Sequence, residues 1–120
     1  MPNKILIVDD ETDICDVLDI VLKEEGFQTS ILTSGKPVYS SVLEDTPDLI
    51  IMDIRLGDMD GRDICRKIKE SREIAKTPII LISASDNMSD KLDGPGAPDD
   101  FVAKPFDIEM LVQTVNRHLA

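Results

Sequence analysis

Five polar residues follow directly after short apolar runs of the chain. Asp9 and Asp10 follow the first such run, Asp53 another, and Ser83 and Lys104 two later ones. Carboxylate oxygens bind hard divalent cations, and a carboxylate can also attack a phosphoryl group. A compact ammonium and a hydroxyl can each contact phosphoryl oxygens. These residue types therefore fit metal-assisted phosphoryl chemistry, provided that the fold brings them together.

The apolar runs alternate with longer segments of helical period, a pattern typical of βαβ units and a parallel sheet. We expect five strands, at residues 5–8, 28–32, 48–52, 79–82 and 101–103. The second strand is the most polar and should lie near an edge. Right-handed crossovers and short connections then predict a flavodoxin-like, doubly wound (βα)5 three-layer sandwich whose parallel strands have the order 2-1-3-4-5.

Local signals mark the ends of the expected helices. Gly26 should stop the first helix, Pro37 suits the first turn of the second, and Asp107 should cap the last. Gly94, Pro95, Gly96 and Pro98 crowd the segment 86–100, where a fourth helix would lie. Because proline and glycine disfavour helix interiors, we expect this helix to be short or irregular.

The carboxyl ends of parallel strands share one edge of a sheet, so the polar residues that follow the strands share it too. The order 2-1-3 makes the first and third strands neighbours, which should bring Asp9, Asp10 and Asp53 into one pocket. When carboxylates lie so close together, either the pKa of one of them is raised or a cation must balance their charge. Mg²⁺ is the ion best suited to this role.

Asp53 is the candidate nucleophile at this edge, with Lys104 and Ser83 as phosphoryl contacts and Ala84 leaving room beside them. Each residue alone has an ordinary structural interpretation, such as a helix cap, a surface lysine or a turn serine. Their joint placement at predicted strand ends favours the functional interpretation.

Composition narrows the function further. The 120 residues suit one domain, 1–120, and 42% are hydrophobic, enough for an ordinary core. A net charge of −11 with 3% aromatic residues disfavours direct nucleic-acid binding. No apolar run approaches the about 20 residues of a membrane span, and no signal peptide is recognisable, so we expect a cytoplasmic location without membrane contact. Cys15 and Cys65 have no metal or disulfide spacing.

The chain resembles the response regulator receiver domain family from about Lys4 to its last residue. The segments that carry the resemblance are KILIVDDE (4–11), PDLIIMDIRL (47–56), MDG (59–61) and DDFVAKPF (99–106). The resemblance implies a phosphoprotein switch of two-component or phosphorelay signalling, not an enzyme in the ordinary sense. Such a switch assists its own phosphorylation and autodephosphorylation.

The resemblance also implies roles for individual residues. Asp53 would accept a phosphoryl group from the phosphohistidine of a sensor histidine kinase or histidine phosphotransfer protein. Asp10, Asp53 and the backbone carbonyl of Arg55 would bind Mg²⁺, or Mn²⁺ in its place, and Asp9 would help through water. Lys104 would contact the phosphoryl group.

Two further residues would transmit the signal in a receiver of this kind. Ser83 would move toward the phosphoryl group and Phe101 would rotate inward. The face made by the fourth helix, the fifth strand and the last helix would then change and control an unidentified partner or attached output domain. A phosphorylation-dependent dimer is one form that this output could take. Gly57 stands where the family usually has proline, which predicts a looser loop beside the acceptor.

Two exposed apolar positions are candidates for docking. Ile20 and Met110 fall on the polar sides of the first and last helices. In relatives the first helix docks the phosphodonor, although single exposed apolar residues are common on any surface.

Three rival functions remain. A degenerate receiver could dock partners without phosphorylation, although the intact acids and lysine oppose this. A phosphohydrolase with an aspartate nucleophile would also need a substrate-binding cap or an acid/base element, and the sequence has no insert that could supply one. A flavodoxin-like mononucleotide binder would need phosphate-cradling glycines after the first strand, where the chain has carboxylates.

Overall fold

The computed structural model describes residues 2–84 and 96–119. One parallel sheet has the strand order β2-β1-β3-β4-β5, so the predicted order is confirmed. The strands are β1 (Lys4–Val8), β2 (Gln28–Leu32), β3 (Leu49–Asp53), β4 (Ile79–Ser83) and β5 (Asp100–Ala103). The helices of the described part are α1 (Thr12–Glu24), α2 (Val38–Glu44), α3 (Gly61–Glu70) and α4 (Ile108–Leu119).

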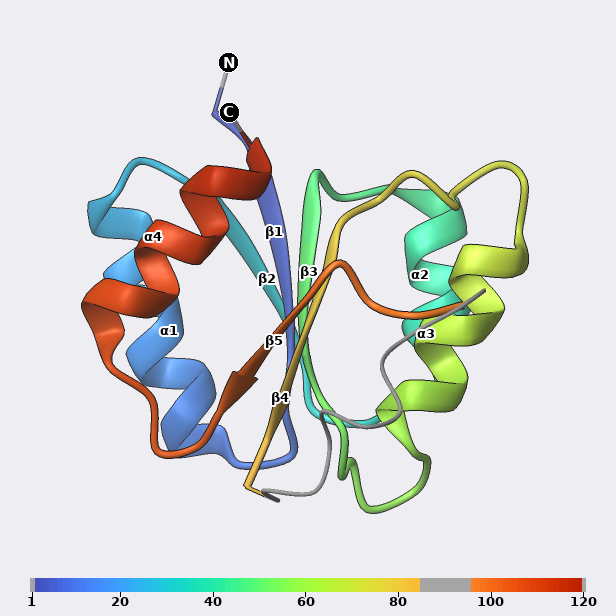
Figure 1. Ribbon diagram of the computed structural model, residues 1–120, viewed down its shortest axis with the longest axis horizontal. Helices are drawn as coiled ribbons and strands as arrows, with labels where there is room; N and C mark the ends of the chain where they lie inside the picture. The colour runs from blue at the N-terminus through green and yellow to red at the C-terminus, as the bar shows by residue number, and fades with distance from the viewer. Residues whose placement is uncertain (1, 85–95, 120) are drawn as a thin grey trace.

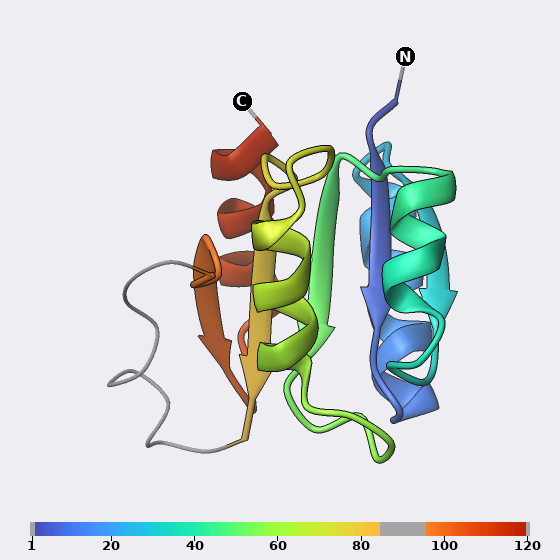
Figure 2. The same cartoon turned by 90° about the vertical axis from the view of Figure 1, so that its right-hand side faces the viewer.

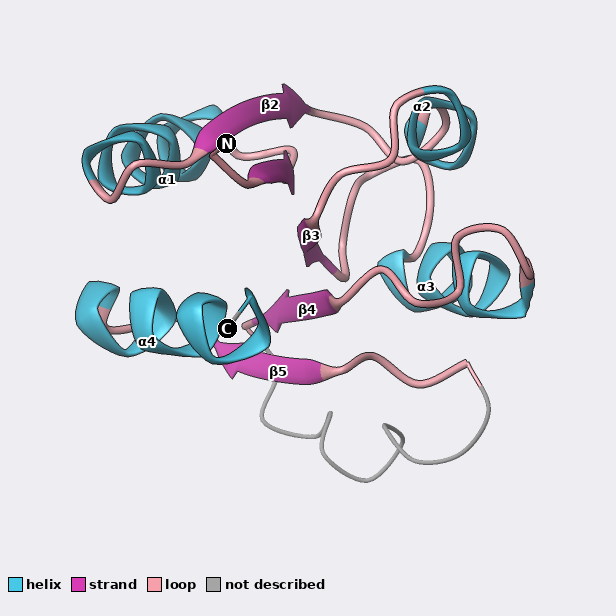
Figure 3. Cartoon of the chain, turned by 90° about the horizontal axis from the view of Figure 1, so that it is seen from above, coloured by secondary structure: helices cyan, strands magenta, loops and turns pink. Residues whose placement is uncertain are grey.

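The sheet is the middle of three layers. Helices α1 and α4 cover one of its faces, and α2 and α3 cover the other (Figures 1 and 3). Figure 2 looks onto α2 and α3 with the strands behind them and β5 at one edge. This is the doubly wound sandwich that the alternation of strands and helices predicts.

Apart from one polar residue at an end of each, the central strands β1, β3 and β4 are apolar, as expected of strands covered on both faces. Successive residues of a strand point to opposite faces, so each strand contributes to two cores. The core under α2 and α3 contains Leu6, Val8, Ile50, Met52, Ile79 and Leu81. The core under α1 and α4 contains Ile5, Ile7, Leu49, Ile51, Ile80 and Ile82. Strand β2 is more exposed and lies at the edge, as predicted.

The register of the strands determines which residues meet at the carboxyl edge. Val8 pairs with Met52, which places the following residues, Asp9 and Asp53, side by side. On the β4–β5 side of the same carboxyl edge, Ser83 pairs with Ala103. The amide of the next residue, Lys104, donates to the Ser83 carbonyl at 2.7 Å. Residues far apart in the sequence thereby share one edge.

The helix boundaries agree with the local signals. Gly26 follows α1 with a φ of 95°, and the Asp107 carboxylate accepts from the Glu109 amide at 2.8 Å at the start of α4. Pro37 immediately precedes α2. The short or irregular helix expected within 86–100 falls mainly on residues 85–95, outside the described residues. Among the helices described, none has the length and apolarity needed to cross a membrane.

We predict that Gly61→Ala destabilises the protein, although alanine usually favours a helix. Gly61 begins α3 directly against the end of β3, where an added Cβ would collide with the backbone oxygen of Asp53 and lie 3.1 Å from Ile54 Cα. Overpacking of this kind costs about 1–3 kcal/mol. Urea denaturation should show the loss, whereas the exposed Gln113→Ala in α4 should stay within about 0.5 kcal/mol of wild type. Stabilisation by Gly61→Ala would contradict the close approach.

Candidate functional site

Three carboxylates meet at the carboxyl edge of β1 and β3, as the strand order predicts. Asp9, Asp10 and Asp53 each place a carboxylate oxygen within 4.8 Å of the others. The side chains of Asp9 and Asp53 are buried, whereas Asp10 is exposed. The cluster is therefore embedded in the protein on one side and open to solvent on the other.

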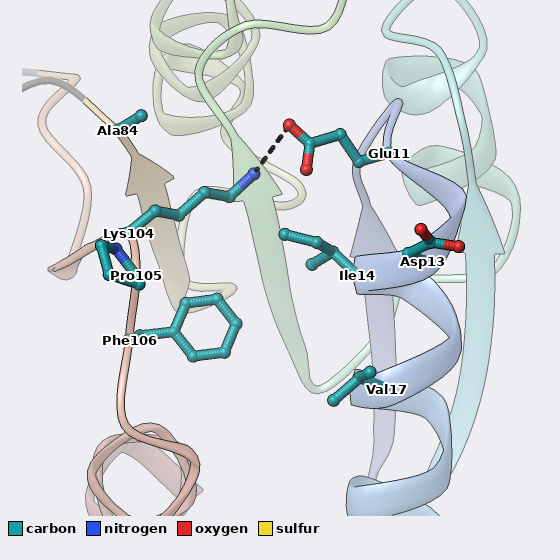
Figure 4. A pocket seen from close by; sticks show the side chains of 8 residues that line it. All are labelled: Glu11, Asp13, Ile14, Val17, Ala84, Lys104, Pro105 and Phe106. Atoms are coloured by element: carbon teal, nitrogen blue, oxygen red, sulfur yellow. Dashed lines mark ion pairs between the residues drawn. The ribbon is translucent and has the colours of Figure 1, made fainter.

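Lys104 supplies the positive charge inside this cluster. Its Nζ lies 3.1 Å from Asp9 Oδ2 and 3.0 Å from Asp53 Oδ2, and the lysine side chain is only 11% exposed. A longer ion pair of 3.9 Å joins it to the exposed Glu11 (Figure 4). One ammonium thus bridges the two buried carboxylates, which come from different strands.

Backbone amides hold the other oxygens of the buried pair. The Glu11 amide donates to Asp9 Oδ1 at 2.9 Å, and the Arg55 amide donates to Asp53 Oδ1 at 3.3 Å. In both cases the donor lies two residues beyond the carboxylate, in the turn that leaves the strand. The loops after β1 and β3 therefore orient the two carboxylates in similar ways.

Burial and nearby charges shift the pKa values of Asp9 and Lys104. Burial raises the pKa of Asp9, and the nearby Asp53 charge adds to this, against the opposing hydrogen bonds from Glu11 and Lys104. Burial alone would lower the pKa of Lys104, but its hydrogen bonds to Asp53 and Asp9 and their charges raise it above the usual lysine value. The ammonium form is thereby favoured where the carboxylates need it.

The donor set fits a hard divalent cation. Three carboxylates with oxygen atoms this close carry excess negative charge that one lysine does not balance, and Mg²⁺ binds such oxygens while keeping water on its open side. The exposed Asp10 side of the cluster is where a hydrated ion could approach. The carbonyl of Arg55 belongs to the loop that leaves this cluster.

Ser83 and Ala84 lie at the same edge of the sheet, whereas the other predicted residues lie further along β5 and on α1 and α4. Ser83 is buried at the end of β4, and Ala84 beyond it is exposed. Phe101 in β5 is partly buried and packs against the core under α2 and α3. The predicted exposure of Ile20 and Met110 is confirmed, at 59% and 52%.

A groove of about 650 Å³ opens beside Lys104, between the start of α1 and the connection from β5 to α4 (Figure 4). Its lining is mainly apolar, with Ile14 and Val17 of α1 facing Phe106. Val17 falls at helical spacing with the other apolar residues of α1, yet its side chain is 46% exposed. The apolar stripe of α1 is wider than the part that the sheet and α4 cover. The residues at the edge of the stripe therefore face this groove. Ile20 and Met110 are not among the residues that line it.

His118 has an acidic partner that its sequence neighbours do not reveal. Its Nε2 lies 3.0 Å from Asp100 Oδ2, and Arg117 donates to the same oxygen at 2.6 Å. The partner comes from β5, 18 residues earlier in the chain, and only the docking of α4 beside that strand brings the two together.

Known families and structures agree with this geometry. The model of the response regulator receiver domain matches residues 5–116. A signal receiver domain of a histidine kinase from Syntrophus aciditrophicus is 32% identical, with a TM-score of 0.89 over 98% of this chain and 89% of that one. A two-component response regulator from Clostridium difficile is 28% identical, with a TM-score of 0.86 over 98% of this chain and 95% of that one.

A third structure contains a metal. The receiver domain of a sensor histidine kinase from Pseudomonas aeruginosa, with a magnesium ion coordinated in its active-site cleft, is 26% identical. Its TM-score is 0.88, over 99% of this chain and 98% of that one.

A doubly wound sheet with an acid–lysine cluster at its carboxyl edge defines a class of α/β domains. Within that class, this chain belongs to the response regulator receiver domain family of two-component signalling. Receiver domains are phosphoacceptor switches, bind Mg²⁺ at an acidic pocket and interact with histidine kinases and downstream effectors.

We predict that Lys104→Ala lowers the free energy of unfolding by about 3 kcal/mol at pH 7.5 without divalent ions, because it leaves two buried carboxylates unpaired. The loss should be smaller at pH 5. A carboxyl whose folded pKa is raised binds a proton more readily when folded, so its contribution to stability falls as pH rises above the unfolded value. Removal of the ammonium enlarges that shift for Asp9.

Thermal unfolding at the two pH values measures this difference. Lys23→Ala is the matched control, because Lys23 pairs with Asp19 on the surface of α1 at 3.1 Å, and its loss should matter little at either pH. An equal loss at both pH values for Lys104→Ala would contradict the charge argument.

Proposed function

We propose that Asp53 is the phosphoacceptor of a receiver domain that spans residues 1–120. The observation that carries this proposal is the bridge from Lys104 to Asp53 Oδ2 at 3.0 Å, inside a cluster that also holds Asp9 and Asp10. Asp53 ends the strand at the switch point of the sheet, where ligands of such folds bind. The phosphoryl source is a histidine kinase or histidine phosphotransfer protein.

In the proposed reaction, an Asp53 carboxylate oxygen bonds to phosphorus while the phosphorus–nitrogen bond of the donor phosphohistidine breaks and imidazole leaves. Lys104 neutralises charge on the phosphoryl oxygens, and Ser83 donates a hydrogen bond to one of them, with Ala84 leaving space. In autodephosphorylation, water attacks the same phosphorus, the phosphorus–oxygen bond to Asp53 breaks, and inorganic phosphate leaves, which returns the carboxylate. The protein mainly positions groups and balances charge.

We assign the Mg²⁺ ligands to Asp10, Asp53 and the backbone carbonyl of Arg55, with Asp9 acting through water; Mn²⁺ is an alternative ion. When bound, the ion supplies charge neutralisation for the transferring phosphoryl group. The buried Asp9 accepts from Glu11 and Lys104, so its role is to hold the lysine and a water molecule in place.

The proposed output uses Ser83 and Phe101. A phosphoryl group that draws Ser83 and Lys104 toward Asp53 acts on neighbouring strand ends, since Lys104 donates its amide to the Ser83 carbonyl. Phe101 lies in β5 and would rotate inward. The face that includes β5 and α4 then changes conformation, and this alters its binding to an effector, an output domain or a second copy of the chain.

A degenerate receiver that docks partners without phosphorylation is the alternative. It gains support only if Asp53 cannot be phosphorylated, since the acids and the lysine are in place. Mass spectrometry decides between the two.

We predict that the intact mass increases by one phosphoryl group on incubation with acetyl phosphate and Mg²⁺, and that the increase disappears without Mg²⁺. Asp53→Ala and Asp53→Asn should abolish it because both lack the nucleophilic oxygen. Asp45→Asn is the control, since this exposed carboxylate lies at the far end of α2 and pairs with Lys4. A wild-type protein that gains no mass would favour the docking module.

The groove beside Lys104 is proposed as the place where the phosphodonor helix docks. Its lining is mainly apolar and includes Val17 and Phe106, and it also includes Lys104, which pairs with Asp53 at 3.0 Å. Ile20 of the same helix and Met110 of α4 are secondary candidates on the surrounding surface.

We predict that Val17→Gln slows phosphoryl transfer from a phosphorylated histidine phosphotransfer domain by about tenfold, the effect of 1.4 kcal/mol of lost contact. Phosphorylation by acetyl phosphate should be unchanged, because this small donor needs no docking surface. Leu43→Gln is the matched control, with similar exposure on α2 at 42%. Equal effects of the two variants would argue against docking in the groove.

A further inference from the structure

The loop between β3 and α3 contains a tight turn. The Leu56 amide donates to the Met59 carbonyl at 3.2 Å, and Arg55 and Asp60 form an isolated bridge across the loop. Gly57 has a φ of 82°, a left-handed conformation that glycine accepts at little cost. The turn projects Asp58 away from the acidic cluster and toward the connection between β2 and α2.

Asp58 anchors the turn to that connection with both of its carboxylate oxygens. Oδ1 accepts from the Gly35 amide at 2.8 Å, and Oδ2 accepts from the Lys36 amide at 3.0 Å. The side chain of Asp58 itself is exposed and lies outside the acidic cluster. Its contacts therefore serve the position of the loop.

Close packing also holds the β3–α3 loop against the β2–α2 connection. A Cβ added to Gly35 would lie 2.8 Å from Ile64 Cδ1, 2.9 Å from Met59 Cβ and 3.2 Å from Leu56 Cδ1. The backbone at Gly35 thus presses directly on side chains of the loop and of α3. Any shift of the loop must break these contacts or the two hydrogen bonds.

The opposite side of the turn faces the acidic cluster. A Cβ added to Gly57 would lie 3.7 Å from Asp10 Oδ2, so the backbone of the turn passes close to that carboxylate. The Arg55 amide also donates to Asp53. The position of this loop therefore sets the distance of the Arg55 backbone from the acids.

We infer that Asp58 is a positioning residue for the divalent-cation site, which it serves by clamping the loop that carries Arg55 to the amides of Gly35 and Lys36. The inference rests on the proposed assignment of the Arg55 carbonyl as a Mg²⁺ ligand. Asp58 does not touch the ion. It limits how far the loop can move from Asp10 and Asp53.

The test is the Mg²⁺ dissociation constant of the full chain, from backbone amide shifts during a MgCl₂ titration at constant ionic strength. Asp58→Ala should weaken binding by about tenfold, as removal of outer-shell support for a metal site does. Asp58→Asn keeps one acceptor oxygen and should lie between Asp58→Ala and wild type. Asp58→Glu keeps the charge but displaces it, and should also weaken binding.

These variants separate the clamp from long-range charge. If charge alone matters, Asp58→Asn and Asp58→Ala weaken Mg²⁺ binding equally and Asp58→Glu matches wild type, which would overturn the inference. Wild-type affinity in Asp58→Ala would overturn it as well. Asp63→Ala is the control, because this exposed carboxylate pairs with Arg66 of the same helix at 3.3 Å, and its loss should change binding by no more than about twofold.

Two further measurements separate this inference from the proposed function. Hydrogen exchange at the Gly35 and Lys36 amides should accelerate in Asp58→Ala without Mg²⁺, while the unfolding midpoint changes little. Unchanged exchange would overturn the clamp itself. A wild-type chain that binds no Mg²⁺ would overturn the proposed metal site and this inference with it, whereas normal wild-type binding with unaffected variants overturns only the inference.

Discussion

The need to balance charge at the carboxyl edge of the sheet constrains the rest of this molecule. Two carboxylates buried side by side on adjacent strands need a nearby cation to offset their repulsion, and that cation is Lys104, which lies 95 residues after Asp9 in the chain. The parallel sheet satisfies this demand because β5 carries the lysine to the same edge. Its apolar strands, buried on both faces, form a rigid support that keeps these charges in place.

Charge balance also explains how such a site can act as a switch. Lys104 divides its hydrogen bonds between Asp9 and Asp53. A doubly negative group added beside Asp53 would draw the lysine and any nearby hydroxyl toward itself. Because the Lys104 amide is bonded to the Ser83 carbonyl, a change at the charge cluster acts directly on the ends of β4 and β5. A few kcal/mol of new hydrogen bonds is enough to shift a two-state element.

Much of the fold and of the acidic cluster could be predicted from the sequence because both follow from short-range patterns. Apolar runs of strand length identify the sheet, and a polar residue after each run belongs to its edge. The exposure of Val17 could not be predicted, because helical periodicity does not say how wide a stripe its neighbours cover. The pairing of His118 with Asp100 depends on how α4 docks.

The loop after Asp53 illustrates how a local pattern and tertiary contacts can oppose each other. Glycine at position 57, where the family resemblance predicts proline, widens the conformational freedom of the unfolded chain and predicts a looser loop. In the folded chain, the same glycine adopts a φ of 82° that proline cannot reach, and this turn brings Asp58 onto the amides of Gly35 and Lys36. Rigidity that proline would supply within the backbone is supplied here by contacts with another loop. The order of the loop then depends on the position of the β2–α2 connection. This connection contributes none of the proposed Mg²⁺ ligands, yet it is coupled to the acidic cluster through the loop.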